Sequence, residues 1–335
     1  MIEVNHLTKR YGDHTAVSDL SFTIEKGQIY GFLGPNGAGK STTMNIMTGC
    51  LAATGGEVKI GGFDIFEQAK EAKKLIGYLP EQPPVYLDRT PREYLHFVAE
   101  AKRLPKAQRT AEVERVMALT GTADVADRLI KHLSKGYRQR VGIAQALLGD
   151  PEIIILDEPT VGLDPIQIKE IRDLIISLKD QHTVILSSHI LSEVQAVCQT
   201  ILIIAHGKLV ACDTPENLEK LFVGTTRVEL VAESDQGAVE TQLCSAVPEC
   251  HWECTEENGR TKALIEVGEA DPEDICRRLF SAFGKADIFV LSMNTIRANL
   301  EDVFMELTAA EGDAEAAAPD EAKEEAEEAG EEENA

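Results

Sequence analysis

Apolar residues occur along the first two thirds of the chain in short runs of strand length, separated by segments with helical spacing. The runs at 28–34, 153–159 and 183–189 begin with apolar residues at nearly every position, which is typical of strands buried on both faces. Further strands are predicted at 2–11, 20–27, 75–80 and 201–210, and a strand with a turn at 57–65. Helices are predicted from about Lys40, at 166–178 and at 192–197. This alternation indicates an α/β domain with a mostly parallel, doubly wound sheet.

Between about residues 86 and 150 the pattern changes from strands to helices. Apolar side chains recur there at intervals of three and four residues, as at Tyr94, Leu95 and Val98. This spacing predicts a helical insertion at about 86–150 within the α/β domain. We expect the whole domain to span residues 1–220.

A second and smaller α/β pattern follows at residues 225–310 and predicts an accessory domain. Its strands are predicted at 227–232, 262–267 and 288–293, and its helices at 271–283 and 299–310. The tail at 311–335 carries twelve acidic residues, one lysine and almost no large apolar side chains. Because it cannot bury a core, we expect it to be disordered, either as a solvating tail or with a docking or regulatory role.

Composition and charge restrict the class of protein. The 335 residues are 43% hydrophobic and 27% charged, which is typical of a globular protein with a sizeable core. The net charge of -24 disfavours nucleic acid as a partner, because phosphate backbones attract basic surfaces. The sequence has neither an apolar stretch of about eighteen residues nor the pattern of a secretion signal. We therefore expect a cytoplasmic protein that relies on another chain for any membrane-spanning part.

The seven cysteines are scattered and odd in number, which does not suggest a disulfide framework. One cluster consists of Cys244, Cys250, His251 and Cys254. Zinc is conceivable there, but the spacing lacks a C-x-x-C pair. Ordinary reduced cysteines are the favoured interpretation.

The stretch GPNGAGKST fits the phosphate-binding pattern G-x-x-x-x-G-K-[ST] and lies between a predicted buried strand and a helix. Its glycines let the backbone N–H groups point inward at a polyphosphate. Lys40 is predicted to reach the β- and γ-phosphates, and the Ser41 hydroxyl to bind Mg²⁺. The residues predicted to hold the nucleotide are Gly34, Pro35, Asn36, Gly37, Ala38, Gly39, Lys40, Ser41 and Thr42.

The stretch IIILDEPT places two acidic residues at the end of another buried strand. This strand delivers Asp157 to the carboxyl edge of the sheet, where α/β folds bind their ligands. Asp157 is predicted to hold Mg²⁺ as the acidic partner of the phosphate loop. Glu158 follows at once with its side chain directed the other way, so that it can accept a proton from an attacking water.

Seven motifs stand in one order along residues 2–213. They are Tyr11, GPNGAGKST, LPEQ, LSKGYRQR, IIILDEPT, GLDP and SSH. This ordered set resembles the ATP-binding subunit of ABC transporters. Residues 133–160, together with 299–308, are similar to the ATPases of bacterial exporter systems.

The resemblance implies a P-loop NTPase fold of the ABC ATPase type that binds ATP and Mg²⁺ and hydrolyses ATP to power transport, with export favoured. It implies two kinds of partner: transmembrane permease subunits and a second ATPase subunit, identical or different. The chain would then lie at the inner face of the cell membrane, held there by the permease.

In this family two ATPase domains face each other head to tail, and the signature stretch of one closes on the ATP of the other. The resemblance therefore implies that Ser134 and Gly136 in LSKGYRQR contact the γ-phosphate of a nucleotide bound by the partner. Lys135 replaces the usual first glycine of this stretch, and Tyr137 replaces its usual glutamine. The residues agree with this interpretation, because Ser-Lys-Gly opens a helical run whose free N–H groups face an anion.

Three further positions match the family motifs one at a time. Tyr11 matches the aromatic residue that stacks on adenine. His189 matches the histidine that contacts the γ-phosphate and orients the attacking water, which Glu158 polarises. Asp164 in GLDP matches the residue that crosses the dimer interface.

The LPEQ segment departs from the family pattern. The family often has glutamine directly after the proline, in contact with Mg²⁺ and water, whereas this chain has Glu81 and then Gln82. Either side-chain oxygen suits magnesium, which is a hard cation. Alignment favours Glu81.

Other functions were weighed against transport. A soluble ABC-type ATPase that acts on a macromolecular complex such as the ribosome or DNA is the main alternative. Such relatives usually carry two cassettes or a long coiled-coil insertion, and this chain has one cassette and no long heptad run. A non-catalytic nucleotide-binding regulator is disfavoured by Glu158 and His189. A small-molecule kinase would not need LSKGYRQR.

Overall fold

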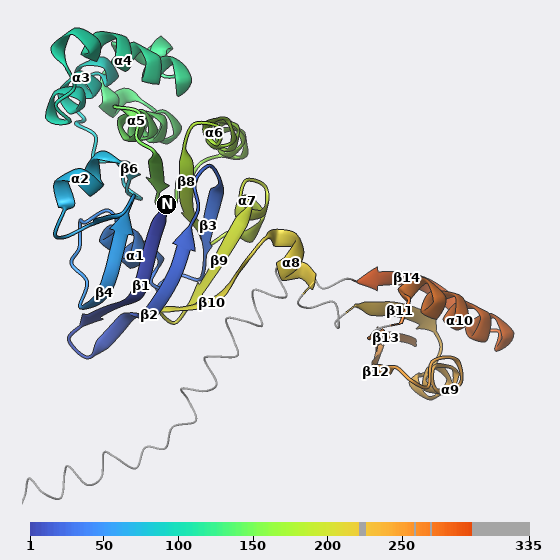
Figure 1. The fold of residues 1–335 in the computed structure, drawn as a ribbon. Coiled ribbons are helices and arrows are strands. Elements are labelled where there is room, and N and C mark those ends of the chain that lie inside the picture. The colour runs from blue at the N-terminus through green and yellow to red at the C-terminus, as the bar shows by residue number, and fades with distance from the viewer. Residues whose placement is uncertain (221–225, 258, 269, 297–335) are drawn as a thin grey trace, which may run out of the picture. The chain divides into compact units, whose positions relative to one another are not determined.

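The computed structural model describes residues 1–220, 226–257, 259–268 and 270–296 (Figure 1). The described chain forms two compact units, and the second begins at Pro215. The helix predicted at 299–310 and the acidic tail at 311–335 lie outside the described residues.

The central sheet of the first unit has five parallel strands and one antiparallel strand. Its order is β10 (Lys208–Asp213), β9 (Thr200–Ala205), β3 (Ile29–Leu33), β8 (Thr183–Ser188), β7 (Ile153–Leu156) and β6 (Ile76–Leu79). The pairs from β9 to β6 are parallel, as the alternation of strands and helices predicted. The prediction of one strand at 201–210 is wrong. The chain turns at His206 and Gly207, both with positive φ, and returns as β10 antiparallel to β9.

The first strands of the chain form a separate antiparallel sheet, which the sequence pattern did not indicate. Its order is β2 (His14–Ile24), β1 (Ile2–Tyr11), β4 (Gly55–Ile60) and β5 (Phe63–Asp64). Helix α1 (Lys40–Met47) contributes Met44 and Met47 to one core with apolar residues of both sheets, such as Leu20 and Phe32. Burial of these side chains stabilises the base from which the phosphate loop projects.

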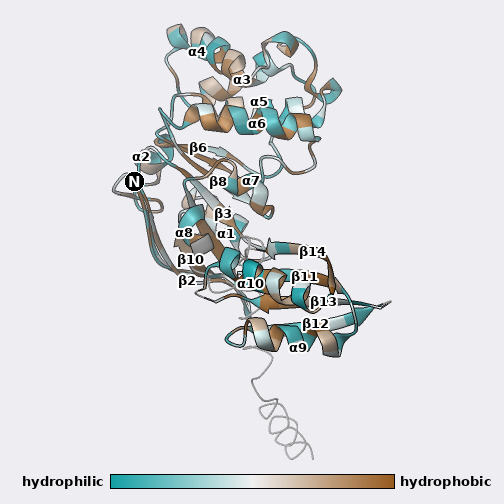
Figure 2. Cartoon of the chain, turned by 90° about the vertical axis from the view of Figure 1, so that its right-hand side faces the viewer, coloured by the Kyte–Doolittle hydropathy of each residue, from teal (hydrophilic) through white to brown (hydrophobic). Residues whose placement is uncertain are grey.

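Further helices cover the central sheet. Helix α6 (Pro165–Leu178) contacts β8, and the short helix α7 (Leu191–Gln195) contacts β3 and β8. Gly31 in β3 permits this approach, because a Cβ there would lie 2.2 Å from a methyl group of Val194. Helix α2 (Ala69–Lys74) lies beside β5 and β6. In Figure 2 the strands of this unit are largely brown, whereas α6 alternates between brown and teal.

The predicted helical insertion contains α3 (Pro91–Ala101), α4 (Lys106–Leu119) and α5 (Lys135–Leu147), which pack on one another. Two short 3-10 turns, η1 (Ala123–Val125) and η2 (Ile130–His132), join α4 to α5. Helix α5 begins at Lys135, because Ser134 caps it. The Ser134 hydroxyl accepts a hydrogen bond from the Tyr137 N–H.

The second unit begins with α8 (Pro215–Lys220) and contains a four-stranded antiparallel sheet. Its strand order is β12 (His251–Glu257), β13 (Arg260–Glu266), β11 (Arg227–Glu233) and β14 (Phe289–Ile296). Helices α9 (Gln236–Ala246) and α10 (Pro272–Lys285) share a core with the sheet. The apolar stripe Ile275, Leu279 and Phe283 of α10 lies in this core, as expected for helical spacing.

The cysteines of the structure are all free thiols. Within the described ranges, no cluster of three or more His, Cys, Asp or Glu side chains has a geometry that could hold a metal ion. Across the same ranges, none of the helices is both long and apolar enough to cross a membrane.

Candidate functional site

Four loops meet at the carboxyl edge of the central sheet because their strands are neighbours. The phosphate loop follows β3, and the acidic pair follows β7. The SSH segment follows β8, which lies between them, and the LPEQ loop follows β6 at the end of the sheet. The strand order thus joins segments that are more than a hundred residues apart in the sequence.

The phosphate loop is held in a conformation that requires glycine. Gly39 has a φ of 100°, and a Cβ there would lie 2.5 Å from the Ala16 carbonyl oxygen. The loop turns around the Lys40 ammonium, which donates to the carbonyl oxygens of Gly34 at 2.7 Å and Pro35 at 3.1 Å. Lys40 is therefore buried and fixed at the centre of its own loop.

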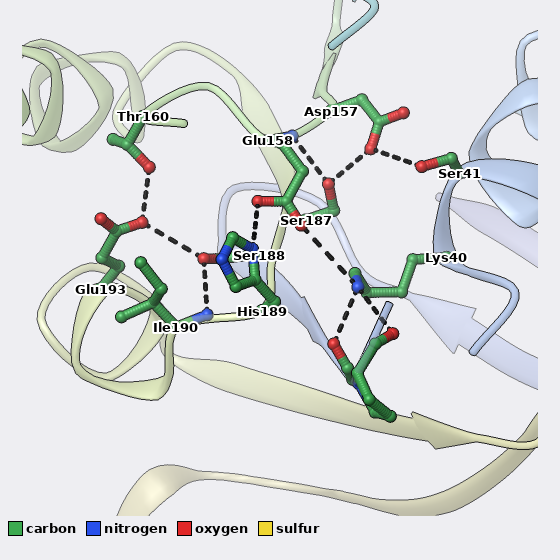
Figure 3. A network of polar contacts seen from close by, with 12 residues as sticks. Lys40, Ser41, Asp157, Glu158, Thr160, Ser187, Ser188, His189, Ile190 and Glu193 are labelled. Carbon is green, nitrogen blue, oxygen red and sulfur yellow. Dashed lines mark hydrogen bonds and ion pairs between the residues drawn. The ribbon is translucent and has the colours of Figure 1, made fainter. Parts of the chain in front are cut away.

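Asp157 lies opposite the first turn of α1. Its Oδ1 accepts hydrogen bonds from the Ser41 hydroxyl at 3.2 Å and the Ser187 hydroxyl at 2.6 Å (Figure 3). The Asp157 side chain is buried, and its Oδ1 is held by these two hydroxyls. Carboxylate and hydroxyl oxygens are the ligands that Mg²⁺ prefers, so this donor set fits the predicted magnesium site.

Glu158 faces away from Asp157, as the sequence predicted. Its backbone has a φ of 46°, in the left-handed region, and its N–H donates to the Ser187 hydroxyl at 2.8 Å. The His189 Nδ1–H donates to Glu158 Oε2 at 3.0 Å, and the Lys40 ammonium lies 3.7 Å from Oε1. An uncommon backbone conformation, held by hydrogen bonds, therefore directs this carboxylate toward a histidine and a lysine.

The electrostatics of the site centre on Lys40. Burial lowers the pKa of its ammonium group, and nearby carboxylates oppose this shift, chiefly Glu158 and to a smaller extent Glu81. The acidic residues therefore stabilise the charged form of this buried lysine. A polyphosphate would provide further negative charge beside the same ammonium.

A cavity of 470 Å³ opens over the phosphate loop. Among the predicted residues, it is lined by Tyr11, Asn36, Gly37, Gly39, Lys40, Ser41, Thr42, Glu81, Glu158 and His189. Tyr11 stands at the end of β1 with about half of its surface exposed. Of the predicted residues that do not line the cavity, Ala38 is buried and Gln82 faces a neighbouring cavity. Of Glu81 and Gln82, Glu81 is thus the residue that lines the cavity over the phosphate loop.

Similarity to known proteins distinguishes among the candidate functions. A family model described as "ABC transporter" matches residues 17–161. The uncharacterized ABC transporter ATP-binding protein YhcH of Bacillus subtilis (strain 168) is 34% identical over 312 residues, covering 92% of this chain and 96% of that protein. The bacitracin transport ATP-binding protein BcrA of Bacillus licheniformis is 36% identical over 310 residues, covering 92% and 97%. This chain belongs to the ABC transporter ATP-binding proteins.

A solved structure agrees with this assignment. The ATP-binding cassette MJ0796, a dimer in a post-hydrolysis state bound to ADP and Pi, is 25% identical and superimposes with a TM-score of 0.58. The match covers 64% of this chain and 98% of that one. The predictions of an ABC ATPase fold, ATP binding and ATP hydrolysis in the service of transport are confirmed. A soluble ABC-type ATPase outside transport is not favoured.

The ABC signature residues line a cavity of their own. Ser134, Gly136 and Asp164 surround a space of 540 Å³, and none of them lines the cavity over the phosphate loop. Asp164 caps α6 by accepting a hydrogen bond from the Gln167 N–H at 2.9 Å. The residues predicted to contact a partner's nucleotide and those of the phosphate loop thus line separate cavities of one chain.

Sequence reasoning missed Ser187, which connects both acidic residues of the site. It also missed a buried network behind His189, in which the Thr160 and Ser188 hydroxyls donate to the Glu193 carboxylate (Figure 3). The available signal was the pair of small hydroxyl residues at the end of a buried strand, directly before the histidine. The contacts that these hydroxyls make depend on β7 and β8 being adjacent, which the sequence alone does not show.

Proposed function

We propose that this ABC ATPase powers export through a separate transmembrane permease, with Glu158 and His189 as its catalytic residues. The observation that carries the proposal is the buried arrangement in which Asp157 faces Ser41 and Glu158 faces Lys40 and His189. It provides a ligand pair for magnesium and a base for water, both next to the phosphate loop. The bacitracin transport function of BcrA supports export.

In the proposed reaction, Glu158 accepts a proton from a water molecule that attacks the γ-phosphorus of ATP. His189 donates a hydrogen bond to Glu158 Oε2 and so fixes the orientation of the carboxylate. Lys40 balances negative charge on the transferring phosphoryl group. The phosphoryl group is released as phosphate, and ADP leaves from the phosphate loop.

Ser41 and Asp157 would hold Mg²⁺, with Glu81 as a further oxygen ligand. When bound, the ion would neutralise negative charge on the phosphates of ATP. Glu81 is assigned rather than Gln82 because only Glu81 lines the cavity over the phosphate loop. Tyr11 would stack on adenine from the edge of the same cavity.

We assign Ser134, Gly136 and Asp164 to the ATP site of a second ATPase subunit. The N-terminus of α5 directs backbone N–H groups into the signature cavity, which suits a γ-phosphate supplied from outside the chain. ATP would then hold two subunits together, and hydrolysis would release them. The dimeric state of the MJ0796 cassette supports this assignment.

The permease is assigned to the groove beside the helical insertion, which would hold the chain at the cytoplasmic face of a membrane. Tyr86, Leu87 and Phe97 are each about half exposed there. The Tyr86 ring packs on Tyr94 and on Phe97, so these side chains form one aromatic patch. Exposed aromatic patches are typical of protein–protein contacts.

The Glu158→Gln variant tests the proposed chemistry. Loss of the base should lower Mg²⁺-dependent phosphate release by about 10²- to 10⁴-fold. ATP binding should remain, because Lys40 and the phosphate loop are unchanged, and the trapped ATP should stabilise a dimer. Phosphate release and size-exclusion chromatography with ATP measure the two effects, with Lys40→Ala as the binding-deficient control. Wild-type turnover in Glu158→Gln would remove Glu158 from the mechanism.

Export is tested in cells that carry the chain together with a permease. Bacteria that express both should survive higher concentrations of a peptide antibiotic than bacteria that express the permease with Glu158→Gln. Equal resistance in the two strains would argue against antibiotic export. That result would leave the assignment of ATPase activity to this chain unchanged.

A further inference from the structure

Glu193 is a buried acidic residue that the proposed chemistry does not use. It lies in the first turn of α7, and 6% of its surface is exposed. In the part of the chain that the structure describes, no basic side chain forms an ion pair with it. Burial of a carboxyl group costs free energy unless hydrogen bonds satisfy it. The hydrogen bonds of Glu193 therefore indicate what this side chain does.

A single oxygen atom of Glu193 joins two segments of the site. Its Oε2 accepts hydrogen bonds from the Thr160 hydroxyl at 2.5 Å and from the Ser188 hydroxyl at 3.2 Å (Figure 3). Thr160 lies two residues after Glu158. Ser188 directly precedes His189. Glu193 thus connects the loop after β7, which carries the proposed base, to the loop after β8, which carries the histidine.

The contact with Ser188 also shapes the backbone around His189. The Ser188 oxygen accepts a hydrogen bond from the Ile190 N–H at 3.0 Å and so closes a turn that spans the histidine. Because the Ser188 hydroxyl donates its proton to Glu193, the lone pairs of its oxygen remain available for this N–H. Glu193 thereby orients the hydroxyl that fixes the backbone of the histidine.

Packing of α7 on the central sheet gives Glu193 a defined position. The next residue, Val194, is fully buried and lies against β3. A Cβ on Gly31 would lie 2.2 Å from a methyl group of Val194, so the helix approaches the strand as closely as glycine allows. Helix α7 is therefore held on the sheet, and the Glu193 carboxylate is held with it.

Glu158 has anchors of its own, which differ from those of His189. Its N–H donates to the Ser187 hydroxyl, and its Oε1 lies 3.7 Å from the Lys40 ammonium. The His189 side chain is 36% exposed and meets Glu158 Oε2 at 3.0 Å. The contact between the two catalytic side chains therefore depends on where the loop after β8 holds the histidine.

We propose that Glu193 is a positioning residue that holds His189 in contact with Glu158. This inference rests on the catalytic roles proposed above for those two residues. Glu193 does not line the cavity over the phosphate loop, and it acts by fixing the loops after β7 and β8 to one another. Without its oxygen, the Thr160 and Ser188 hydroxyls lose their common acceptor, and the histidine ring moves away from the base.

A double-mutant cycle with His189→Ala tests whether Glu193 acts through the histidine. Glu193→Met removes the acceptor oxygen and keeps a side chain of similar length. Alone it should lower kcat about 10- to 100-fold, because a small displacement of a catalytic group is enough for such a loss. The KM for ATP should stay within about twofold, since the phosphate loop is unchanged. In the His189→Ala protein the same change should lower kcat by less than about twofold.

Two milder variants separate the hydrogen bonds from the fold. Glu193→Gln keeps an acceptor oxygen, so its turnover should stay within about threefold of wild type. Thr160→Val removes one of the two donors with little change of shape. It should lower kcat about 3- to 10-fold, again only when His189 is present. Thr160→Val also takes the place of Glu193→Met in the cycle if Glu193→Met does not fold.

Thr183→Val is the matched control for Thr160→Val. Thr183 is buried at the start of β8, at the opposite end of the strand from Ser188, and its hydroxyl accepts a hydrogen bond from the Gly27 N–H at 3.0 Å. Both variants lose a buried threonine hydroxyl, so both should lower the midpoint of thermal unfolding. Thr183→Val should leave kcat unchanged. Release of phosphate from γ-labelled ATP measures turnover even in the slow variants.

The inference is overturned if Glu193→Met lowers kcat equally with and without His189, or if Glu193→Gln loses as much turnover as Glu193→Met. It is also overturned if Thr183→Val reproduces the loss of turnover seen in Thr160→Val. These results contradict only the role of Glu193, provided that His189→Ala itself is slow. Wild-type turnover in His189→Ala or in Glu158→Gln contradicts the proposed catalytic residues themselves.

Discussion

Two neighbouring residues, Asp157 and Glu158, divide the proposed chemistry between a magnesium ligand and a base. Ser187 makes this division possible, because its hydroxyl donates to the Asp157 carboxylate and accepts from the Glu158 N–H. The serine is fully buried, so water cannot replace either hydrogen bond. The left-handed backbone of Glu158 depends on this contact.

The Ser187→Ala variant should therefore lose activity and stability together. Leaving the Glu158 N–H without its partner should lower the free energy of unfolding by about 1–3 kcal/mol. Turnover should fall about tenfold or more, because the carboxylate is no longer fixed. Thermal unfolding and phosphate release measure the two effects. Ser177→Ala is the control, since Ser177 is exposed on α6 and bonds only within its own helix; equal losses in both variants would contradict this role for Ser187.

At the scale of elements, strand order places the site and helix ends adjust it. The parallel strands β3, β8 and β7 bring their loops to one edge of the sheet. Helix α5 projects from this sheet with Ser134 at its start, and Lys102 binds its far end. The Lys102 ammonium donates to the Leu148 carbonyl at 2.7 Å, where the helix dipole favours positive charge.

Lys102 should make stability depend on pH above neutrality. Burial lowers the pKa of its ammonium to about 8 from the ordinary 10.5. Between these values the unfolded chain binds more protons than the folded chain, so the contribution of Lys102 to the free energy of unfolding rises with pH. The ammonium end lies among carbonyl oxygens, but Lys102 as a residue is exposed, so solvent screening reduces this desolvation cost to about 1 kcal/mol. The cost is present in full below about pH 8.

The comparison of wild type with Lys102→Met isolates this contribution. The difference in free energy of unfolding, wild type minus variant, should increase from pH 7.5 to pH 10 by up to about 1 kcal/mol. Urea unfolding at several pH values gives the difference. Lys106→Met, at the start of α4, is the matched control, since it removes the same charge from the same helical insertion. A difference for Lys102→Met that stays constant over this range would contradict the lowered pKa.

The elements that the sequence predicted are those with a strong local pattern. The buried strands of the central sheet are apolar throughout, and the phosphate loop is a contiguous motif, so both were evident from the residues. Helix α9 was missed because Val239 and Leu243 are its only buried residues. Strand β12 was missed because it is an edge strand rich in glutamate. The Ser187 contacts could not be predicted, since they depend on which strands are neighbours.

At the scale of the whole molecule, the two half-sites of one ABC ATPase chain belong to different cavities. Lys40 and Glu158 line one, and Ser134 and Gly136 line the other. The proposed head-to-tail dimer would resolve this separation, because each nucleotide would then meet the phosphate loop of one copy and the signature of the next. The central claim is therefore that ATP binding is local to one chain and that dimer formation needs the signature of another.

Ser134→Asp in the Glu158→Gln protein tests this claim most directly. Aspartate caps a helix as well as serine does, so α5 should stay folded, but its charge would repel a γ-phosphate held by a second copy. Ser134→Asn, which caps without the charge, is the control. We predict that Ser134→Asp binds ATP with its affinity unchanged within about twofold and no longer forms the ATP-dependent dimer on size-exclusion chromatography. A dimer that persists at full yield in Ser134→Asp, or an equal loss of ATP binding by the monomer, would contradict the account.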